Sequence, residues 1–223
     1  MEEKAKNAVK TFEDLAQAVA DSGRPYDAGR IEKAYEMAAA AHAGQTRLSG
    51  ESYVSHPVAV ACLVVDLGLD TDSVVAALLH DSVEDTETTA EDVKAAFGPD
   101  VALLVDGVTK LGRIKFSSVE EQQAENLRKM LLAMSQDVRV MIIKLCDRLH
   151  NMRTGDAWPE QKRRDKALET MEVYAPIAHR LGISNIKEEL EDRSLQYLDP
   201  VGYNMIRSLL NKHGDDFLND ICA

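Results

Sequence analysis

The stretch VVAALLHDSVED (residues 74–85) sets an unbroken apolar run directly before a histidine and three carboxylates. A helix that is apolar on every side is a buried helix, so the run predicts a helix inside the core. In a continuous helix, residues four apart share a face, which stacks His80 with Glu84 and Asp81 with Asp85. The stretch therefore predicts a compact polar patch at the end of a buried helix.

A buried patch of this kind needs a counter-charge. Three carboxylates buried close together are strongly unfavourable unless they are protonated or compensated by a cation. A divalent metal ion held by imidazole and carboxylate groups meets this need, so His80 and Asp81 are candidate metal ligands. The alternative is an acidic helix end that runs into solvent, a description that fits Glu87 and Glu91.

Helix signals recur along the 223 residues, and only 5% of them are aromatic. Methionine, alanine and leucine outweigh aromatic and β-branched residues, which favours helix over sheet. There is no strand–helix alternation, glycine-rich nucleotide motif or internal repeat, so the sequence predicts an all-α domain. Helical patterns include residues 30–44, 55–68, 119–136, 137–153 and 162–182, and 111–118 has the pattern of a loop.

Charge and cysteine content exclude several classes of protein. The net charge of -12 lacks the basic footprint of a nucleic-acid-binding protein. Three cysteines without a CxxC pair indicate a reduced, cytoplasmic protein rather than a disulfide scaffold or thiolate zinc site. The N-terminus has no signal-peptide core, and the apolar run 58–65 is far shorter than the ~20 residues of a membrane span.

A second apolar helix, predicted over 137–153, carries inserted polar residues. Lys144, Asp147, Arg148 and Asn151 share one face of it by helical spacing. Asp147 is the obvious carboxylate ligand from this helix. Lys144 and Arg148 are placed either for an anionic substrate or for pairing with that ligand, and an internal Lys–Asp–Arg salt-bridge ladder is the purely structural alternative.

His56 immediately precedes Pro57, a residue typical of the first helical position. It therefore sits at a helix N-terminus, from which a side chain can project into a cleft. A lone histidine there is more often a cap or core residue, so its role depends on the other candidates. Of the remaining histidines, His150 is expected on the apolar side of the Asp147 helix, and His42 is expected to pack at a helix end.

The order His56, His80–Asp81, Asp147 resembles the ligand order of HD-domain metallo-phosphohydrolases. Longer motifs resemble one family within them, the hydrolase domain of the RelA/SpoT-type (p)ppGpp synthetase/hydrolases, over roughly residues 25–200. These motifs are HAGQTRLSGESYVSHP (42–57), AALLHDSVEDT (76–86), FGPDVALLVDGVTKL (97–111), QAENLRKMLLAM (123–134), IKLCDRLHNMRT (143–154) and YAPIAHRLGISNIKEELED (174–192).

The resemblance implies an HD-domain helical bundle that hydrolyses the 3′-pyrophosphate of ppGpp and pppGpp to GDP or GTP plus pyrophosphate, and so degrades the alarmone of the stringent response. It implies one Mn²⁺ held by His56, His80, Asp81 and Asp147. It also implies that Glu84 and Asp85 activate or position the attacking water. The guanosine nucleotide site implied by the resemblance consists of Arg47, Ser49, Asn151 and Thr154, to which helical spacing adds Lys144 and Arg148.

Two positions depart from the family pattern. The family usually has lysine between the residues that match Arg47 and Ser49, where this chain has Leu48. A lysine contact to the nucleotide is therefore missing, which bears on affinity or substrate preference and not on the metal chemistry. The family commonly has alanine before the aspartate ligand, and here Cys146 is expected to be a small core residue.

We expect residues 1–200 to form the hydrolase domain and 201–223 to form a helical segment that leads toward an absent synthetase domain. The chain is then an excised N-terminal piece or a small stand-alone hydrolase, and the piece is favoured. Three other functions stay open: an HD phosphohydrolase acting on another nucleotide, a non-catalytic alarmone-binding module, and a helical interaction module. The last of these leaves the acidic patch unexplained.

Overall fold

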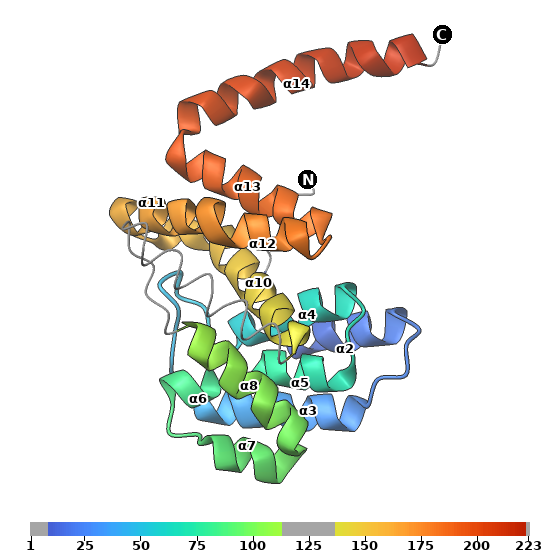
Figure 1. The fold of residues 1–223 in the computed structure, drawn as a ribbon, viewed down its shortest axis with the longest axis vertical. Helices are drawn as coiled ribbons and strands as arrows, with labels where there is room; N and C mark the ends of the chain where they lie inside the picture. The colour runs from blue at the N-terminus through green and yellow to red at the C-terminus, as the bar shows by residue number, and fades with distance from the viewer. Residues whose placement is uncertain (1–8, 113–136, 222–223) are drawn as a thin grey trace. The chain divides into compact units, whose positions relative to one another are not determined.

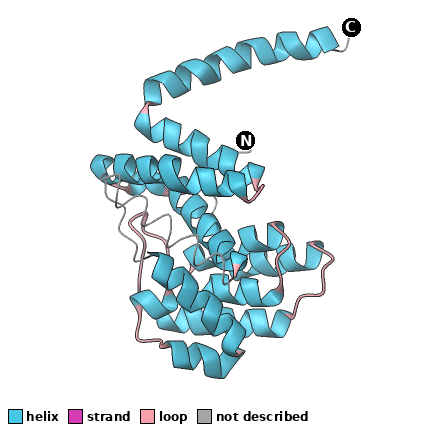
Figure 2. Ribbon diagram, viewed as in Figure 1, coloured by secondary structure: helices cyan, strands magenta, loops and turns pink. Residues whose placement is uncertain are grey.

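The computed structural model describes residues 9–112 and 137–221, and every regular element among them is a helix (Figure 2). The described residues contain no β-strand, and an isolated antiparallel bridge pairs Thr46 with Ser52. The predicted all-α fold is confirmed. The helix expected over 119–136, and all but the first two residues of the loop expected over 111–118, lie outside the described residues.

The chain forms two compact units, Met1–Ala157 and Trp158–Ala223. The first unit (Figure 1) contains α2 (Phe12–Asp21), α3 (Ala28–Ala41), α4 (Ser55–Asp66), α5 (Thr71–Leu79), α6 (Ser82–Asp85), α7 (Ala90–Phe97), α8 (Pro99–Gly112), α10 (Val138–Arg153) and a 3-10 turn, Gly155–Ala157. The second contains α11 (Glu160–Glu169), the π-helical turn η2 (Thr170–Tyr174), α12 (Ala175–Arg180), α13 (Ser184–Leu198) and α14 (Pro200–Ile221).

Helix α5 lies at the centre of the first unit, in contact with α3, α4, α8 and α10. All its side chains from Ser73 to Leu79 are buried, as the apolar run predicts. Full burial of a leucine or valine side chain contributes about 1.5–3 kcal/mol, so the helix is held firmly in place. His80, which directly follows Leu79, is therefore held at a fixed position in the core.

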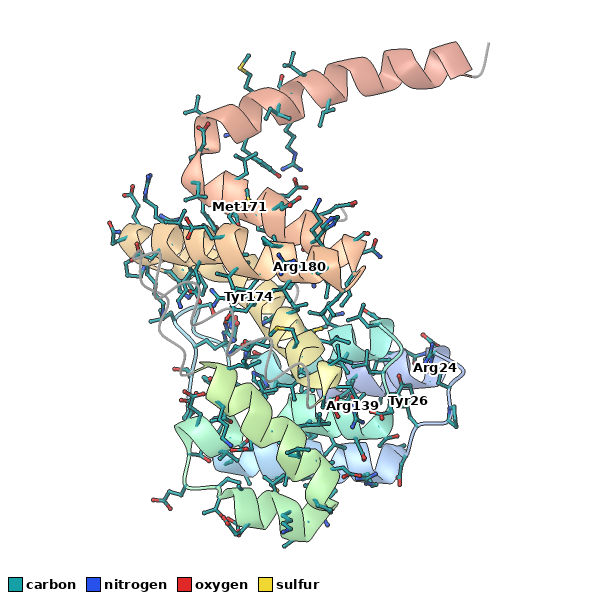
Figure 3. The ribbon with its side chains drawn as sticks, viewed as in Figure 1. Arg24, Tyr26, Arg139, Met171, Tyr174 and Arg180 are labelled. Carbon is teal, nitrogen blue, oxygen red and sulfur yellow. The ribbon has the colours of Figure 1, made fainter. Side chains whose placement is uncertain are left out.

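The loop between α2 and α3 holds the segment just before α5. The Tyr26 hydroxyl donates to the Leu69 carbonyl oxygen at 2.6 Å, and the Arg24 guanidinium donates to the Gly68 carbonyl oxygen. Figure 3 shows Arg24 and Tyr26 on this loop. Gly68 has a φ of 71°, a left-handed conformation that glycine adopts without strain, and it ends α4.

Asp70 caps the N-terminus of α5, because its carboxylate accepts a hydrogen bond from the Ser73 amide at 2.9 Å. Its other oxygen lies 2.7 Å from the Arg139 guanidinium, which is labelled in Figure 3. Partial burial alone would raise the pKa of Asp70, but the Ser73 hydrogen bonds and Arg139 bring it below its usual value of 3.8.

We predict that Asp70→Ala lowers the free energy of unfolding by about 1 kcal/mol, the usual cost of losing an N-cap. Asp70→Asn keeps the cap and loses only the charge. A carboxylate whose pKa is lowered by folding stabilises the fold above its unfolded pKa and stops doing so as the pH falls. In urea unfolding, the advantage of wild type over Asp70→Asn should therefore shrink below about pH 4. A pH-independent difference would contradict this account.

In the second unit, the helix expected over 162–182 is interrupted. The π-helical turn Thr170–Tyr174 separates α11 from α12 just before Pro176. Proline lacks an amide hydrogen and its ring clashes with the carbonyl four residues earlier, so a continuous α-helix is unfavourable here. The wider π turn accommodates this locally.

Helix α14 contacts α13 and leaves the side chains of Val201, Met205, Ile206 and Leu210 exposed. The expected end of the hydrolase domain at residue 200 coincides with the start of this helix and stays a prediction. None of the described helices combines the length and apolar character needed to cross a lipid bilayer.

Candidate metal centre

Three separate segments of the first unit bring ligand-type side chains together. His56 lies in the first turn of α4, His80 directly follows α5, and Asp147 lies in the middle of α10. Because α4 packs against both α5 and α10, these side chains converge, and one ligand atom from each lies within 4.8 Å of the others. His56 Nε2 is 3.2 Å and His80 Nε2 is 3.9 Å from Asp147 Oδ1.

The orientation of His80 is fixed by the end of α5. Its Nδ1 atom lies 2.7 Å from the Ala77 carbonyl oxygen, which can only accept, so Nδ1 carries the hydrogen. Nε2 then presents a lone pair. This atom is buried without a hydrogen-bond partner, although Asp81 Oδ1 is 3.1 Å away. A buried lone pair without a donor is the feature that a metal ion would satisfy.

Asp81 is the fourth expected ligand, and it lies beside the other three. Its Oδ2 atom is 3.5 Å from His56 Nε2 and accepts a hydrogen bond from the Tyr53 hydroxyl at 2.9 Å. The hydrogen bond from the Tyr53 hydroxyl favours the ionised form of the Asp81 carboxylate, which is the form that a ligand requires.

Asp147 is almost fully buried, and its charge is compensated on two sides. Lys144 Nζ lies 2.6 Å from Oδ2, and Asn151 Nδ2 donates to Oδ1 at 2.5 Å. Burial alone would raise the pKa of Asp147, but the Lys144 ammonium holds it well below its usual range. Lys144 is thus paired with the candidate ligand, one of the two roles expected for it.

The prediction of one continuous helix through the acidic patch is wrong. Helix α5 ends at Leu79, His80 and Asp81 form a turn, and the four-residue α6 follows. The Asp85 amide still donates to the Asp81 carbonyl oxygen at 2.9 Å, so the expected stacking of Asp81 and Asp85 survives. The Glu84 amide also donates to the Asp81 carbonyl oxygen, at 3.1 Å.

The expected burial of three carboxylates is also wrong. Asp81 is half-buried, whereas Glu84 and Asp85 are exposed. The Tyr53 hydroxyl lies 3.0 Å from Asp85 Oδ2 and 2.9 Å from Asp81 Oδ2, so it bridges the exposed carboxylate and the candidate ligand. The patch therefore has a buried part, suited to binding a cation, and an exposed part next to it.

The expected nucleotide-binding residues are linked by hydrogen bonds to α10. Arg47 Nη2 donates to Asn151 Oδ1 at 3.2 Å and to Thr154 Oγ1 at 3.0 Å. Ser49 and Thr154 line a cavity of 260 Å³. Arg148, by contrast, is buried within the unit. The structure thus brings Arg47, Asn151 and Thr154 together and places Ser49 at the adjacent cavity.

The protein-family model described as "HD domain" matches residues 34–184, most of the chain. The chain belongs to the HD domain family. The Escherichia coli K12 protein described as a bifunctional (p)ppGpp synthase/hydrolase, SpoT, is 49% identical over 199 residues, which cover 89% of this chain and 28% of that protein. A guanosine-3′,5′-bis(diphosphate) 3′-pyrophosphohydrolase of Aquifex aeolicus is 48% identical over 204 residues, covering 92% of this chain and 29% of that protein.

A solved structure is also similar to this HD domain. It is described as a metazoan ortholog of SpoT that hydrolyzes ppGpp, with 30% identity and a TM-score of 0.54, and the match covers 78% of this chain and 98% of that one. The resemblance to RelA/SpoT-type hydrolase domains is therefore confirmed. The chain spans less than a third of the length of the two curated relatives named above.

Sequence reasoning missed three residues that lie at the candidate metal centre or at the adjacent cavity. His150, expected on the apolar side of α10, instead places its Nδ1 atom 2.7 Å from Nδ1 of His56. Burial, the His56 ring and Arg47 lower the pKa of His150 well below its usual value. Tyr53 was also missed, although its spacing of three residues before His56 was a usable signal. Lys10 lines the 260 Å³ cavity from a segment far from every motif.

We predict that Mn²⁺ raises the Tm of the metal-free HD domain. An ion at 100 times its dissociation constant stabilises a protein by about 2.7 kcal/mol, or about 5–10 °C for a domain of this size. Asp147→Asn should abolish the rise, whereas Asp106→Asn, which removes a carboxylate in α8 outside the cluster, should keep it. Each variant is compared with its own Tm in EDTA. Equal rises in all three proteins would contradict a specific metal centre at Asp147.

Proposed function

We propose that this chain hydrolyses the 3′-pyrophosphate of ppGpp and pppGpp, releasing pyrophosphate and leaving GDP or GTP. The observation that carries the proposal is the convergence of His56, His80 and Asp147, with His80 Nε2 buried and unpartnered. The names of the relatives from Escherichia coli O157:H7 and Aquifex aeolicus, both guanosine-3′,5′-bis(diphosphate) 3′-pyrophosphohydrolases, support the choice of substrate.

We propose Mn²⁺ as the ion, held by His56, His80, Asp81 and Asp147. Imidazole and carboxylate ligands suit Mn²⁺. The thiol next to Asp147 does not compete, because burial raises the pKa of Cys146 and keeps it protonated. When bound, such an ion polarises a phosphoryl oxygen and makes a nearby water more acidic.

In the reaction, a water oxygen bonds to the phosphorus that is attached to the ribose 3′ oxygen. The bond between that phosphorus and the 3′ oxygen breaks. One water proton must leave, and the 3′ oxygen must gain one. Glu84 and Asp85 are the proposed groups that accept or orient the water proton, since both are exposed beside Asp81. Tyr53 holds Asp85 at that place through its contacts with both aspartates.

The nucleotide is proposed to bind at Arg47, Ser49, Asn151 and Thr154. The 260 Å³ cavity at Ser49 and Thr154 is lined by two cations, Lys10 and Arg153, and by two carboxylates, Glu51 and Asp156, so its formal charge is balanced. A guanidinium that is already oriented by Asn151 and Thr154 suits a phosphate oxygen. Lys144 and Arg148, expected as further substrate contacts, would act indirectly, since Lys144 pairs with Asp147 and Arg148 is buried.

We predict pyrophosphate release from ppGpp by the metal-stripped protein only after Mn²⁺ is added. Asp81→Asn should abolish release, and Glu84→Gln or Asp85→Asn should lower kcat by about 10²- to 10⁴-fold, the usual effect of losing a general acid or base. Glu87→Gln, an exposed carboxylate in the same stretch, is the matched control and should keep the wild-type rate. Release that does not depend on Mn²⁺, or that is unaffected by Asp81→Asn, would refute the mechanism.

The same preparation separates the alternatives. An HD phosphohydrolase for another nucleotide would turn over a different member of a substrate panel faster than ppGpp. A non-catalytic alarmone sensor would bind ppGpp in calorimetry and release no product with Mn²⁺ present. The exposed Glu84–Asp85 pair beside the candidate ligands favours catalysis over sensing.

We predict that Leu48→Lys lowers KM for ppGpp. Leu48 is 70% exposed, so the substitution costs little stability, and it restores a cation between Arg47 and Ser49. An exposed ion pair contributes about 0.2–1 kcal/mol, which corresponds to a roughly 1.5- to 5-fold change in KM. Leu48→Gln serves as the uncharged control. An equal effect of both substitutions would argue against a charge contact with the nucleotide.

The proposal extends to a longer protein. The Escherichia coli K12 relative is named a bifunctional synthase/hydrolase, and this chain covers 28% of it. We therefore propose a synthetase domain in the same polypeptide, with residues 1–200 as the hydrolase domain and 201–223 as the helical segment that leads toward it.

A further inference from the structure

A direct contact between two histidines lies behind the candidate metal centre. The Nδ1 atoms of His56 and His150 are 2.7 Å apart, and the two rings are 2% and 8% exposed. Two neutral imidazoles at this distance share one hydrogen between their Nδ1 atoms, so one ring donates and the other accepts. The direction of this hydrogen bond decides what His56 offers on its other side.

Only one direction is compatible with a metal ligand. If His150 donates, His56 must carry its own hydrogen on Nε2, which then points at Asp147 Oδ1, 3.2 Å away. If His56 donates from Nδ1, its Nε2 atom presents a lone pair to the space shared with Asp81 and Asp147. The acceptor in that case is Nδ1 of His150.

The two candidate histidine ligands are thus oriented by different devices. His80 donates Nδ1–H to the Ala77 carbonyl, a backbone group that can only accept, so its tautomer is fixed. His56 faces a side chain that can donate or accept, and its tautomer depends on that partner. Histidine ligands commonly donate their other ring hydrogen to a carboxylate, carbonyl or water, and loss of that acceptor usually weakens metal binding.

We propose that His150 is a positioning residue that accepts a hydrogen bond from Nδ1 of His56 and so turns the Nε2 lone pair of His56 toward the metal ion. This inference rests on the proposed metal centre. His150 itself is not a ligand, because the atom that faces the centre is already used in the contact with His56. Its ring also lines the 260 Å³ cavity, so it lies between the metal ligand and the proposed substrate pocket.

Two substitutions separate positioning from packing. His150→Phe keeps the planar ring and removes the acceptor, whereas His150→Asn loses ring volume and keeps an acceptor, since its amide oxygen stands where Nδ1 stood. Metal-free proteins would be checked for folding by circular dichroism and then titrated with Mn²⁺ in a calorimeter. We expect His150→Phe to weaken Mn²⁺ binding by about 10- to 100-fold and His150→Asn to restore most of the affinity.

The direction of the hydrogen bond can be read independently. In ¹⁵N-labelled wild type loaded with diamagnetic Zn²⁺, imidazole NMR should show His56 protonated at Nδ1 and His150 protonated at Nε2. The opposite tautomer of His150 would overturn the proposal.

Three outcomes of the titration are decisive against it. Wild-type affinity in a folded His150→Phe variant, or equal losses in the Phe and Asn variants, would show that His150 only fills space. A wild type that binds no metal would refute the metal centre as well. The first two results leave the proposed function intact, so the two failures are distinguishable.

Discussion

The arrangement of the candidate metal centre depends on the hydrogen bond from His80 to the Ala77 carbonyl, because this bond orients a candidate ligand from the end of a buried helix. A helix leaves its last carbonyl groups without partners, and a buried helix end must satisfy them locally. At the end of α5, the His80 ring does so at 2.7 Å, and the same contact turns its other nitrogen toward Asp147. Because α5 is buried on all sides, that nitrogen is positioned by the whole core of the first unit.

The charge balance around Asp147 follows from the same burial. An ionised carboxylate inside a protein is stable only when nearby cations or hydrogen-bond donors replace its water. Lys144 and Asn151, one turn away on either side, supply them from the same helix. Lys144 therefore keeps Asp147 ionised, and of the two roles that helical spacing allowed for this lysine, the structure shows the pairing with the candidate ligand.

The sequence predicted those features that depend on neighbours along one helix. The buried apolar run before His80 and the shared face of Lys144, Asp147 and Asn151 are both of this kind, and both are confirmed. The end of α5 at Leu79 was missed because a prediction from hydrophobic periodicity treats the helix as continuous. The contact of His150 was missed because the helical pattern of α10 reveals only which residues share a face. It does not reveal that His56, from another helix, packs against His150.

One chain of hydrogen bonds connects the proposed nucleotide site to the candidate metal centre. Arg47 donates to Asn151 Oδ1, and the Asn151 amide donates to Asp147 Oδ1, the oxygen that faces His56 and His80. A phosphate that draws Arg47 away from Asn151 would change the donor strength of that amide toward Asp147. Substrate binding and metal binding would then be linked through one asparagine, and any such coupling acts equally in both directions.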